Sequence, residues 1–310
     1  FALGFILWGI SESFCSGSEE SLLFDNLKTK NEEKVFGKVY GKGNFFSSIG
    51  VALSCLTGGF LSSLITYKGV LLLSVLFMIV SILLVTKFRE VNYFKMKNDD
   101  KPDDDHLNPL GTLFEATLVC VRTKQLLMVI LMLVLVIGTS GILDEYDPII
   151  VKSYNVNLGI IGIWISIRYV LEAIGAKFAY LFRSMFSRIG IKSDFYTVCL
   201  VCLTSGILLL VFGIGSSIVL IPLYGIFYLF MASAGVIQEE YVQQTIDEQG
   251  RSTVHSIISL LHNIYGILFV CVVGLSISKV GIHLGITVIS IYILILTVFL
   301  YSIYRIYTRR

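Results

Sequence analysis

The sequence predicts an all-α protein that crosses a membrane several times. Hydrophobic residues make up 55% of the 310 residues and charged residues only 15%, whereas a water-soluble domain carries about 25% charged residues. The apolar residues gather in runs that are long enough to cross a bilayer, and most basic residues lie in loops on one side of these runs. Together these observations exclude an ordinary soluble domain.

Nine apolar runs approach or exceed the roughly 20 residues that a membrane-spanning helix needs. They cover residues 1–20, 44–66, 69–87, 125–144, 157–182, 194–214, 217–238, 254–278 and 283–304. The third run is short, but it contains no charge between Lys68 and Lys87. We therefore expect about nine transmembrane helices.

Two hydrophilic stretches interrupt this series. The first joins the first two runs and carries five lysines, Lys28, Lys30, Lys34, Lys38 and Lys42. The second follows Lys87, and its charged segment 98–105 has no apolar period, which is typical of a flexible linker. Residues 109–121 then predict a short helix on the membrane surface. We expect a helical bundle at 1–87, a linker at 88–124 and a six-helix bundle at 125–310.

Lysine and arginine are distributed unevenly between the two faces of the predicted bundle. Of the 24 such residues, three lie in loops on one face (Lys68, Lys152 and Lys279), and Arg168 and Lys177 lie within a run. The others fall on the opposite face, which the positive-inside tendency makes cytoplasmic. We expect a multi-pass protein of the cell membrane, embedded in lipid, with a cytoplasmic C-terminus.

The second and eighth runs share small residues at a constant offset. The matching pairs are Gly50 with Gly266, Cys55 with Cys271, and Gly58 with Gly274. Three runs precede the linker and six follow it, and parallel repeats are a known design of transporters. We therefore expect two related halves of six helices, with three helices preceding Phe1 in a longer chain.

Three motifs carry a resemblance to a known family. They are Ser16-Gly17-x-Glu19-Glu20-x-Leu22-Leu23-Phe24-Asp25-x-Leu27-Lys28, Asp144-Glu145-Tyr146-x-Pro148 and Arg251-x-Thr253-Val254-x-Ser256. Together with the predicted architecture, they resemble the major facilitator superfamily, and most closely its bacterial exporters of drugs and other small molecules. The first motif is similar to the family's pattern at the cytoplasmic end of its fourth helix.

The resemblance implies a two-bundle fold in which the present chain supplies helices 4–12 of 12. It implies a monomeric secondary transporter that exports a small organic solute by alternating access, coupled to protons and without a cofactor. The sequence contains no phosphate-binding loop, zinc motif or nucleophile elbow, so we expect no enzyme activity, no metal site and no nucleic-acid partner. The alternative is a polytopic membrane sensor or receptor, or a membrane-embedded enzyme, without transport activity.

Charged side chains inside a membrane span are costly and usually functional. Glu12 lies about 20 Å along the first helix from Asp25, either in a central cavity or in a structural hydrogen bond. Arg168 and Glu172 are four residues apart in the fifth run, so they share one helix face and can pair. This pair is either structural or, with Glu12, part of a substrate and proton-coupling site.

Further charged residues cluster near the ends of the runs. They are either solvated or parts of gates, and in the inner gate Arg251 would pair with Asp25 or Glu240. The candidates for the outer gate, at a helix end marked by Pro148, are Asp144, Glu145 and Asp147. The candidates for the inner gate are Glu19, Asp25, Glu240 and Arg251.

Small residues and histidines complete the set of predicted features. A smooth ridge that another helix can approach closely is predicted at Gly50, Ser54, Gly58 and Ser62. Two histidines near the start of the eighth run, His255 and His262, are either hydrogen-bonded packing residues or parts of a coupling site.

Overall fold

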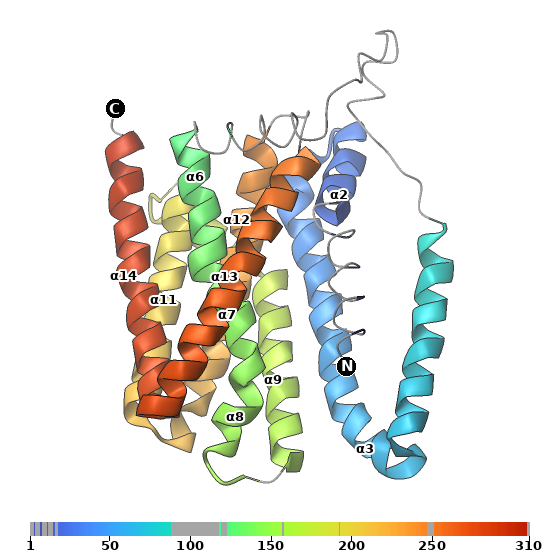
Figure 1. The fold of residues 1–310 in the computed structure, drawn as a ribbon. Coiled ribbons are helices and arrows are strands. Elements are labelled where there is room, and N and C mark those ends of the chain that lie inside the picture. The colour runs from blue at the N-terminus through green and yellow to red at the C-terminus, as the bar shows by residue number, and fades with distance from the viewer. Residues whose placement is uncertain are drawn as a thin grey trace.

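A computed structural model represents the fold of the protein. It describes residues 18–87, 123–156, 158–191, 193–246 and 251–308, together with Leu3, Leu7, Ser11, Cys15 and Leu118. Glu12, the linker and, apart from Leu118, the predicted surface helix lie outside the described residues. All regular secondary structure in the described part of the chain is helical (Figure 1).

The N-terminal part of the described chain consists of three helical elements. They are α2 (Ser18–Thr29), the short 3-10 helix η1 (Glu33–Val35) and α3 (Phe36–Val85). Thr66 has φ 64° and interrupts α3, so that the chain reverses direction there. The predicted boundary between the second and third apolar runs falls at this residue. The part that follows the turn, Lys68–Val85, stands apart from the other helices, and its apolar side chains are exposed (Figure 1).

The next transmembrane stretch is a composite helix. It consists of α6 (Lys124–Leu131), the π-helical segment η2 (Met132–Ile137), α7 (Gly138–Leu143), the 3-10 segment η3 (Asp144–Tyr146) and α8 (Asp147–Lys152). In η2 the backbone N–H of Gly138 donates to the carbonyl of Leu133, five residues earlier. The carbonyl of Leu135 also accepts hydrogen bonds from Thr139 Oγ1 at 2.8 Å and from Tyr292 OH at 3.2 Å. Side chains therefore support the π segment.

The prediction that this helix ends near residue 144 is wrong. Pro148 does not terminate it, because it occupies the first turn of α8, where the missing N–H of proline costs no hydrogen bond. The 3-10 segment η3 carries the chain directly into α8. Asp144 and Asp147 therefore lie inside a continuous helical stretch rather than at its solvated end.

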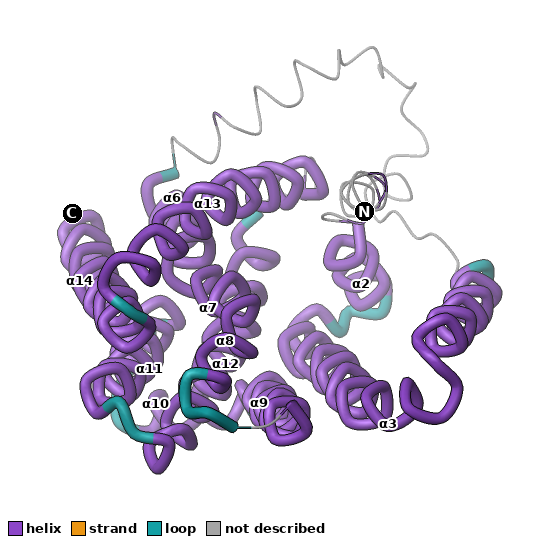
Figure 2. Tube along the Cα trace, turned by 60° about the horizontal axis from the view of Figure 1, so that its bottom comes forward, coloured by secondary structure: helices purple, strands orange, loops and turns teal. Residues whose placement is uncertain are grey.

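The remaining helices complete the bundle. They are α9 (Leu158–Lys177), α10 (Ala179–Arg188), α11 (Asp194–Gly215), η4 (Ile218–Leu220), α12 (Ile221–Thr245), α13 (Arg251–Val280) and α14 (Ile282–Thr308). In Figure 2, α11 packs beside α12 and α14, and α9 lies between α12 and α3. The buried core follows this arrangement, with Val198, Leu209, Phe227 and Ile293 among its residues.

Six stretches of the described chain are long and apolar enough to cross a membrane. They are Lys68–Val85, Lys124–Lys152, Asp194–Gly215, Ile218–Thr245, Thr253–Val280 and Ile282–Thr308. Helix α9 runs alongside them, is 20 residues long and carries three charged residues, Arg168, Glu172 and Lys177. The protein is therefore an all-helical polytopic membrane protein, as the composition predicts.

Helix α3 approaches α9 at a different glycine from those predicted. A Cβ at Gly41 would overlap the backbone carbonyl oxygen of Ala176 on α9. By contrast, a Cβ at Gly50 or Gly58 would meet no atom of the described residues within 4 Å. Between α3 and α9 the close approach is therefore at Gly41, and whether another helix packs on the predicted ridge stays a prediction. Further along, Ser166 Oγ on α9 donates to the carbonyl of Ala52 on α3 at 3.0 Å.

Candidate functional site

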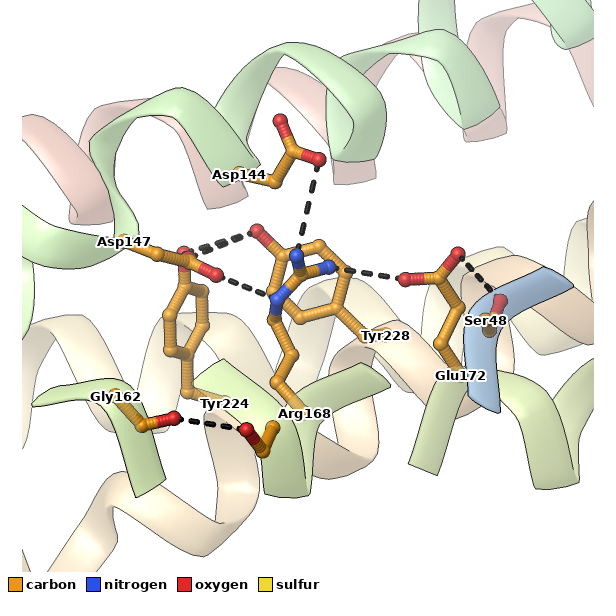
Figure 3. Close-up of polar contacts among 9 residues, drawn as sticks. Ser48, Asp144, Asp147, Gly162, Arg168, Glu172, Tyr224 and Tyr228 are labelled. Atoms are coloured by element: carbon orange, nitrogen blue, oxygen red, sulfur yellow. Dashed lines mark hydrogen bonds and ion pairs between the residues drawn. The ribbon is translucent and has the colours of Figure 1, made fainter. Parts of the chain in front are cut away.

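Arg168 lies at the centre of a charged cluster inside the bundle. Its side chain is only 2% exposed, yet three carboxylates surround it. Its Nε lies 2.5 Å from Asp147 Oδ2, its Nη1 donates to Glu172 Oε2 at 2.9 Å, and its Nη2 lies 3.8 Å from Asp144 Oδ2. Figure 3 shows the guanidinium pointing into the space between α9 and the composite helix.

Asp147 is the buried anchor of this cluster. The hydroxyls of Tyr224 and Tyr228, one turn apart on α12, both donate to its Oδ1, the second at 3.1 Å (Figure 3). The Tyr228 ring also lies under the Arg168 guanidinium, 4.4 Å from its centroid to the guanidinium carbon. Burying a charge is costly unless it is paired and hydrogen-bonded. Asp147 meets both conditions, so it fixes the position of Arg168.

Asp144 and Glu172 form the open side of the same cluster. Their side chains are 28% and 30% exposed, and both line a cavity. Ser48 on α3 donates to Glu172 Oε1 at 3.5 Å, which links the cluster to the N-terminal helices. These two carboxylates can therefore change partners more readily than the enclosed Asp147.

The first cavity has a volume of about 360 Å³ and lies between α3 and the C-terminal helices. Ligand pockets typically measure about 300–1,000 Å³, so the cavity suits a small organic molecule. Asp144, Arg168 and Glu172 line one part of it and Glu239 another, and Tyr40 and Tyr228 add aromatic surface. The cavity therefore combines charged groups with apolar walls.

A second cavity, of about 450 Å³, adjoins the first. Both are lined by Tyr40, Leu133, Ile137 and Glu239. The second cavity is also lined by residues of α2 and α13, namely Glu19, Glu20, His255, Ile258, Ser259 and His262. Of the inner-gate candidates, Glu19 therefore faces a cavity, and Asp25 is half-buried further along α2.

Glu240 belongs to a separate ionic network. Its Oε2 lies 2.9 Å from Nη1 of Arg183 on α10, and the same guanidinium donates to both carboxylate oxygens of Asp194 at 2.7 and 2.5 Å. Burial opposes the charge of Arg183, but the carboxylates of Glu240 and Asp194 more than compensate and raise its pKa. Among the described residues the cation that pairs with Glu240 is Arg183, and the side chain of Arg251 lies outside them, so its predicted pairing with Asp25 or Glu240 stays a prediction.

A sequence model of the Major Facilitator Superfamily matches residues 1–270. The chain belongs to the Major Facilitator Superfamily. A comparison with curated protein sequences gave no significant match. Superfamily membership makes the protein a membrane transporter, in agreement with the apolar helices and with the cavities between them.

The structure of this superfamily transporter brings some predicted residues together and separates others. The pair expected from the four-residue spacing of Arg168 and Glu172 forms, and Asp144 and Asp147 join it, although they were expected to lie apart from it. Glu145 is exposed. Glu12 and the side chain of Arg251 lie outside the described residues. In the described part of the transporter, no group of three or more His, Cys, Asp or Glu side chains is arranged so that it could hold a metal ion.

Several residues that form hydrogen bonds or ion pairs in these clusters were not predicted from the sequence of the transporter. They are Ser48, Arg183, Asp194, Tyr224, Tyr228 and Gln243. The spacing of Tyr224 and Tyr228 is a signal that could have been used, because residues four apart share a helix face. The burial of Glu239 and Glu240 had no such signal, since α12 continues to Thr245, seven residues beyond the predicted end of the run at 238.

Proposed function

We propose that the protein is a secondary active transporter that exports a small organic solute in exchange for protons by alternating access. The observation that carries this proposal is the charged cavity between α3 and the helices α7, α9 and α12. It contains a buried cation with exchangeable carboxylate partners, which is a suitable site for a solute that carries a charged group.

The charge balance of the cluster supports coupling to protons. Three carboxylates surround one guanidinium, and excess buried negative charge must be neutralised by a cation or by protons. Because Asp147 holds Arg168 in place, a bound solute would act on the two cavity-lining carboxylates, Asp144 and Glu172. Binding of solute and binding of a proton at these groups are then mutually exclusive, which is what exchange requires.

We further propose that residues 1–87 and 125–310 are parts of two halves that move against each other, and that the C-terminus is cytoplasmic. The contact of Gly41 with Ala176 joins α3 to α9. Nearby, Gly37 lies so close to Glu240 that a Cβ would overlap its Oε2. The Arg183–Glu240–Asp194 network would thus act as part of an inner gate, since opening of the halves separates Glu240 from α3.

Flux measurements on the full-length protein in lipid vesicles test this function. Vesicles that contain a pH-sensitive dye would be exposed to a panel of fluorescent organic cations, organic anions and neutral solutes. We expect at least one solute to move and to drive an opposite movement of protons. The variants Glu12→Gln and Glu172→Gln should reduce the rate or uncouple the solute from the proton.

The exposed Glu32, which lies in the loop before η1, provides a matched control. Glu32→Gln removes a carboxylate outside both cavities and should leave flux and coupling unchanged. If Glu12→Gln and Glu172→Gln behave like Glu32→Gln, the assignment of the site is wrong. If no solute in the panel drives proton movement, the proposal that transport is coupled to protons is wrong.

A further inference from the structure

Glu239 is a buried carboxylate at the boundary between the two cavities. It lies on α12, eleven residues after Tyr228, and therefore about 16 Å along the helix from the Arg168 cluster. Its side chain lines both cavities. A group in this position can interact with a solute in the first cavity and with water or protons in the second.

Gln243 and His255 form a hydrogen-bonded cluster with Glu239. The Gln243 Nε2 donates to Glu239 Oε1 at 3.1 Å and lies 2.6 Å from Nε2 of His255. His255 Nε2 in turn lies 3.4 Å from Glu239 Oε1. Since the amide donates to both, the imidazole Nε2 acts as an acceptor and the carboxylate accepts while charged.

The amide oxygen of Gln243 suggests a second arrangement. It is buried and has no hydrogen-bond partner among the described residues, although buried polar atoms are normally paired. A half-turn of the amide would place this oxygen between Glu239 and His255. There it could accept a hydrogen from a protonated Glu239 and from an imidazole that carries its hydrogen on Nε2. Between the two arrangements the neutral imidazole exchanges a hydrogen on Nδ1 for one on Nε2, and the Glu239 carboxylate gains one proton from the solvent, so the net difference is one proton.

The groups that face this cluster carry negative charge, and protons can balance it. Helix α2 contributes the carboxylates of Glu19 and Glu20, α3 the hydroxyl of Tyr40, and α13 the imidazole of His262. The neighbouring Glu240 pairs instead with Arg183. Among the described residues that line the two cavities, Arg168 is the only lysine or arginine, and it has its own carboxylates. A proton on Glu239 or His255 therefore balances the negative charge of the carboxylates around the second cavity.

We propose that Glu239, His255 and Gln243 form a second proton-binding site, which exchange requires in addition to the carboxylates of the Arg168 cluster. This inference rests on the proposed function and adds a second coupling site to it. Glu239 binds the proton, His255 shares it, and Gln243 positions both and changes its orientation with the protonation state. Because Glu239 also lines the solute cavity, solute and proton affect each other there.

Infrared difference spectroscopy of the full-length protein in lipid vesicles tests this site without a known solute. A protonated carboxylic acid has a carbonyl stretch that the carboxylate lacks, so a pH titration detects it. We expect the wild-type protein to show such a band from a buried carboxyl and the Glu239→Gln variant to lose it. In Gln243→Leu and His255→Gln the band should remain but titrate at a different pH.

The exposed carboxylate of Glu32 is again the control, and Glu32→Gln should leave the band of the buried carboxyl in place. The proposal is overturned if Glu239→Gln shows the same band as the wild type, or if the wild type shows no such band at any pH. If Glu239→Gln does not fold, His255→Gln decides the matter, because an unchanged titration in that variant would exclude a shared proton.

Flux measurements distinguish this inference from the function on which it rests. In Glu239→Gln we expect the exchange of solute for solute across the membrane to continue, while a pH gradient no longer drives net solute transport. Equal gradient-driven transport in this variant and in the wild type would exclude Glu239 as a coupling site while leaving transport itself intact. A lack of flux in the wild type would instead contradict the proposed function, whereas the infrared band would still establish whether Glu239 binds a proton.

Discussion

Nε of Arg168 lies 2.5 Å from Oδ2 of Asp147, and this contact joins α9 to α8 inside the bundle. Removal of one partner of a buried ion pair leaves an uncompensated charge, which typically costs about 3–5 kcal/mol. Arg168→Met should therefore lower the thermal midpoint of the purified protein strongly. Fluorescence-detected unfolding in detergent measures this change.

A double variant provides the control for that prediction. Arg168→Met combined with Asp147→Asn removes both charges, so it should be more stable than Arg168→Met alone. Arg168→Lys should not restore stability fully, because an ammonium group cannot reproduce the planar fork of a guanidinium. A double variant less stable than either single variant would show that the pair is not the source of the effect.

Gly41 should not tolerate a larger side chain. Gly41→Ala places a methyl group against the carbonyl of Ala176, and overpacking of a close contact typically costs about 1–3 kcal/mol. Gly43→Ala is the matched control, because its Cβ would meet no atom of the described residues within 4 Å. We expect Gly41→Ala to lower the thermal midpoint and the flux rate. Gly43→Ala should lower neither of them.

The Arg183 network should respond to salt, whereas the Arg168 cluster should not. Arg183 is 35% exposed, and partly exposed ion pairs are screened by dissolved ions. An increase in salt concentration should lower the thermal midpoint of the wild type slightly and that of Arg183→Gln less. Equal salt dependence in the two proteins would argue against a contribution of Arg183 to stability.

Tyr292 should stabilise the π segment through its hydroxyl. Tyr292→Phe removes the donor to the Leu135 carbonyl, and loss of such a hydrogen bond costs about 1 kcal/mol. We expect faster amide hydrogen exchange in Met132–Ile137 and a modest fall in the thermal midpoint. Tyr307→Phe is the control, because its ring contact with Lys124 does not require the hydroxyl.

The sequence predicted those features that depend on local patterns. Apolar run length predicted the transmembrane helices, and four-residue spacing predicted the pair of Arg168 and Glu172. Contacts between helices are not encoded in such patterns, so the positions of Asp147 and Arg183 beside their partners could not be predicted. The conclusion that Pro148 ends a helix failed because proline is disfavoured in helix interiors but accepted in the first turn.

The close approach of α3 to α9 was not predicted for a related reason. Regular spacing of Gly50 and Gly58 shows only that the helix surface is smooth, and not that another helix approaches there. The described structure uses Gly41 instead, where the backbone of α9 is close enough to exclude a methyl group. The position of this contact therefore depends on the lack of space for a side chain at Gly41, which the spacing of the glycines does not reveal.

The π segment η2 also has a consequence for comparisons between relatives. A π turn holds more residues than an α turn, so the same residues between Lys124 and Asp144 wound as a regular α-helix would rotate everything after them by about 100°. Both Asp144 and Asp147 lie after η2, and their carboxylates would then turn away from Arg168. A relative that lacks one residue in this segment would keep the same orientation with a regular α-helix, whereas a relative of equal length needs the π turn to present the same side chains to its arginine. The length of the chain here, and not only its composition, thus specifies the site.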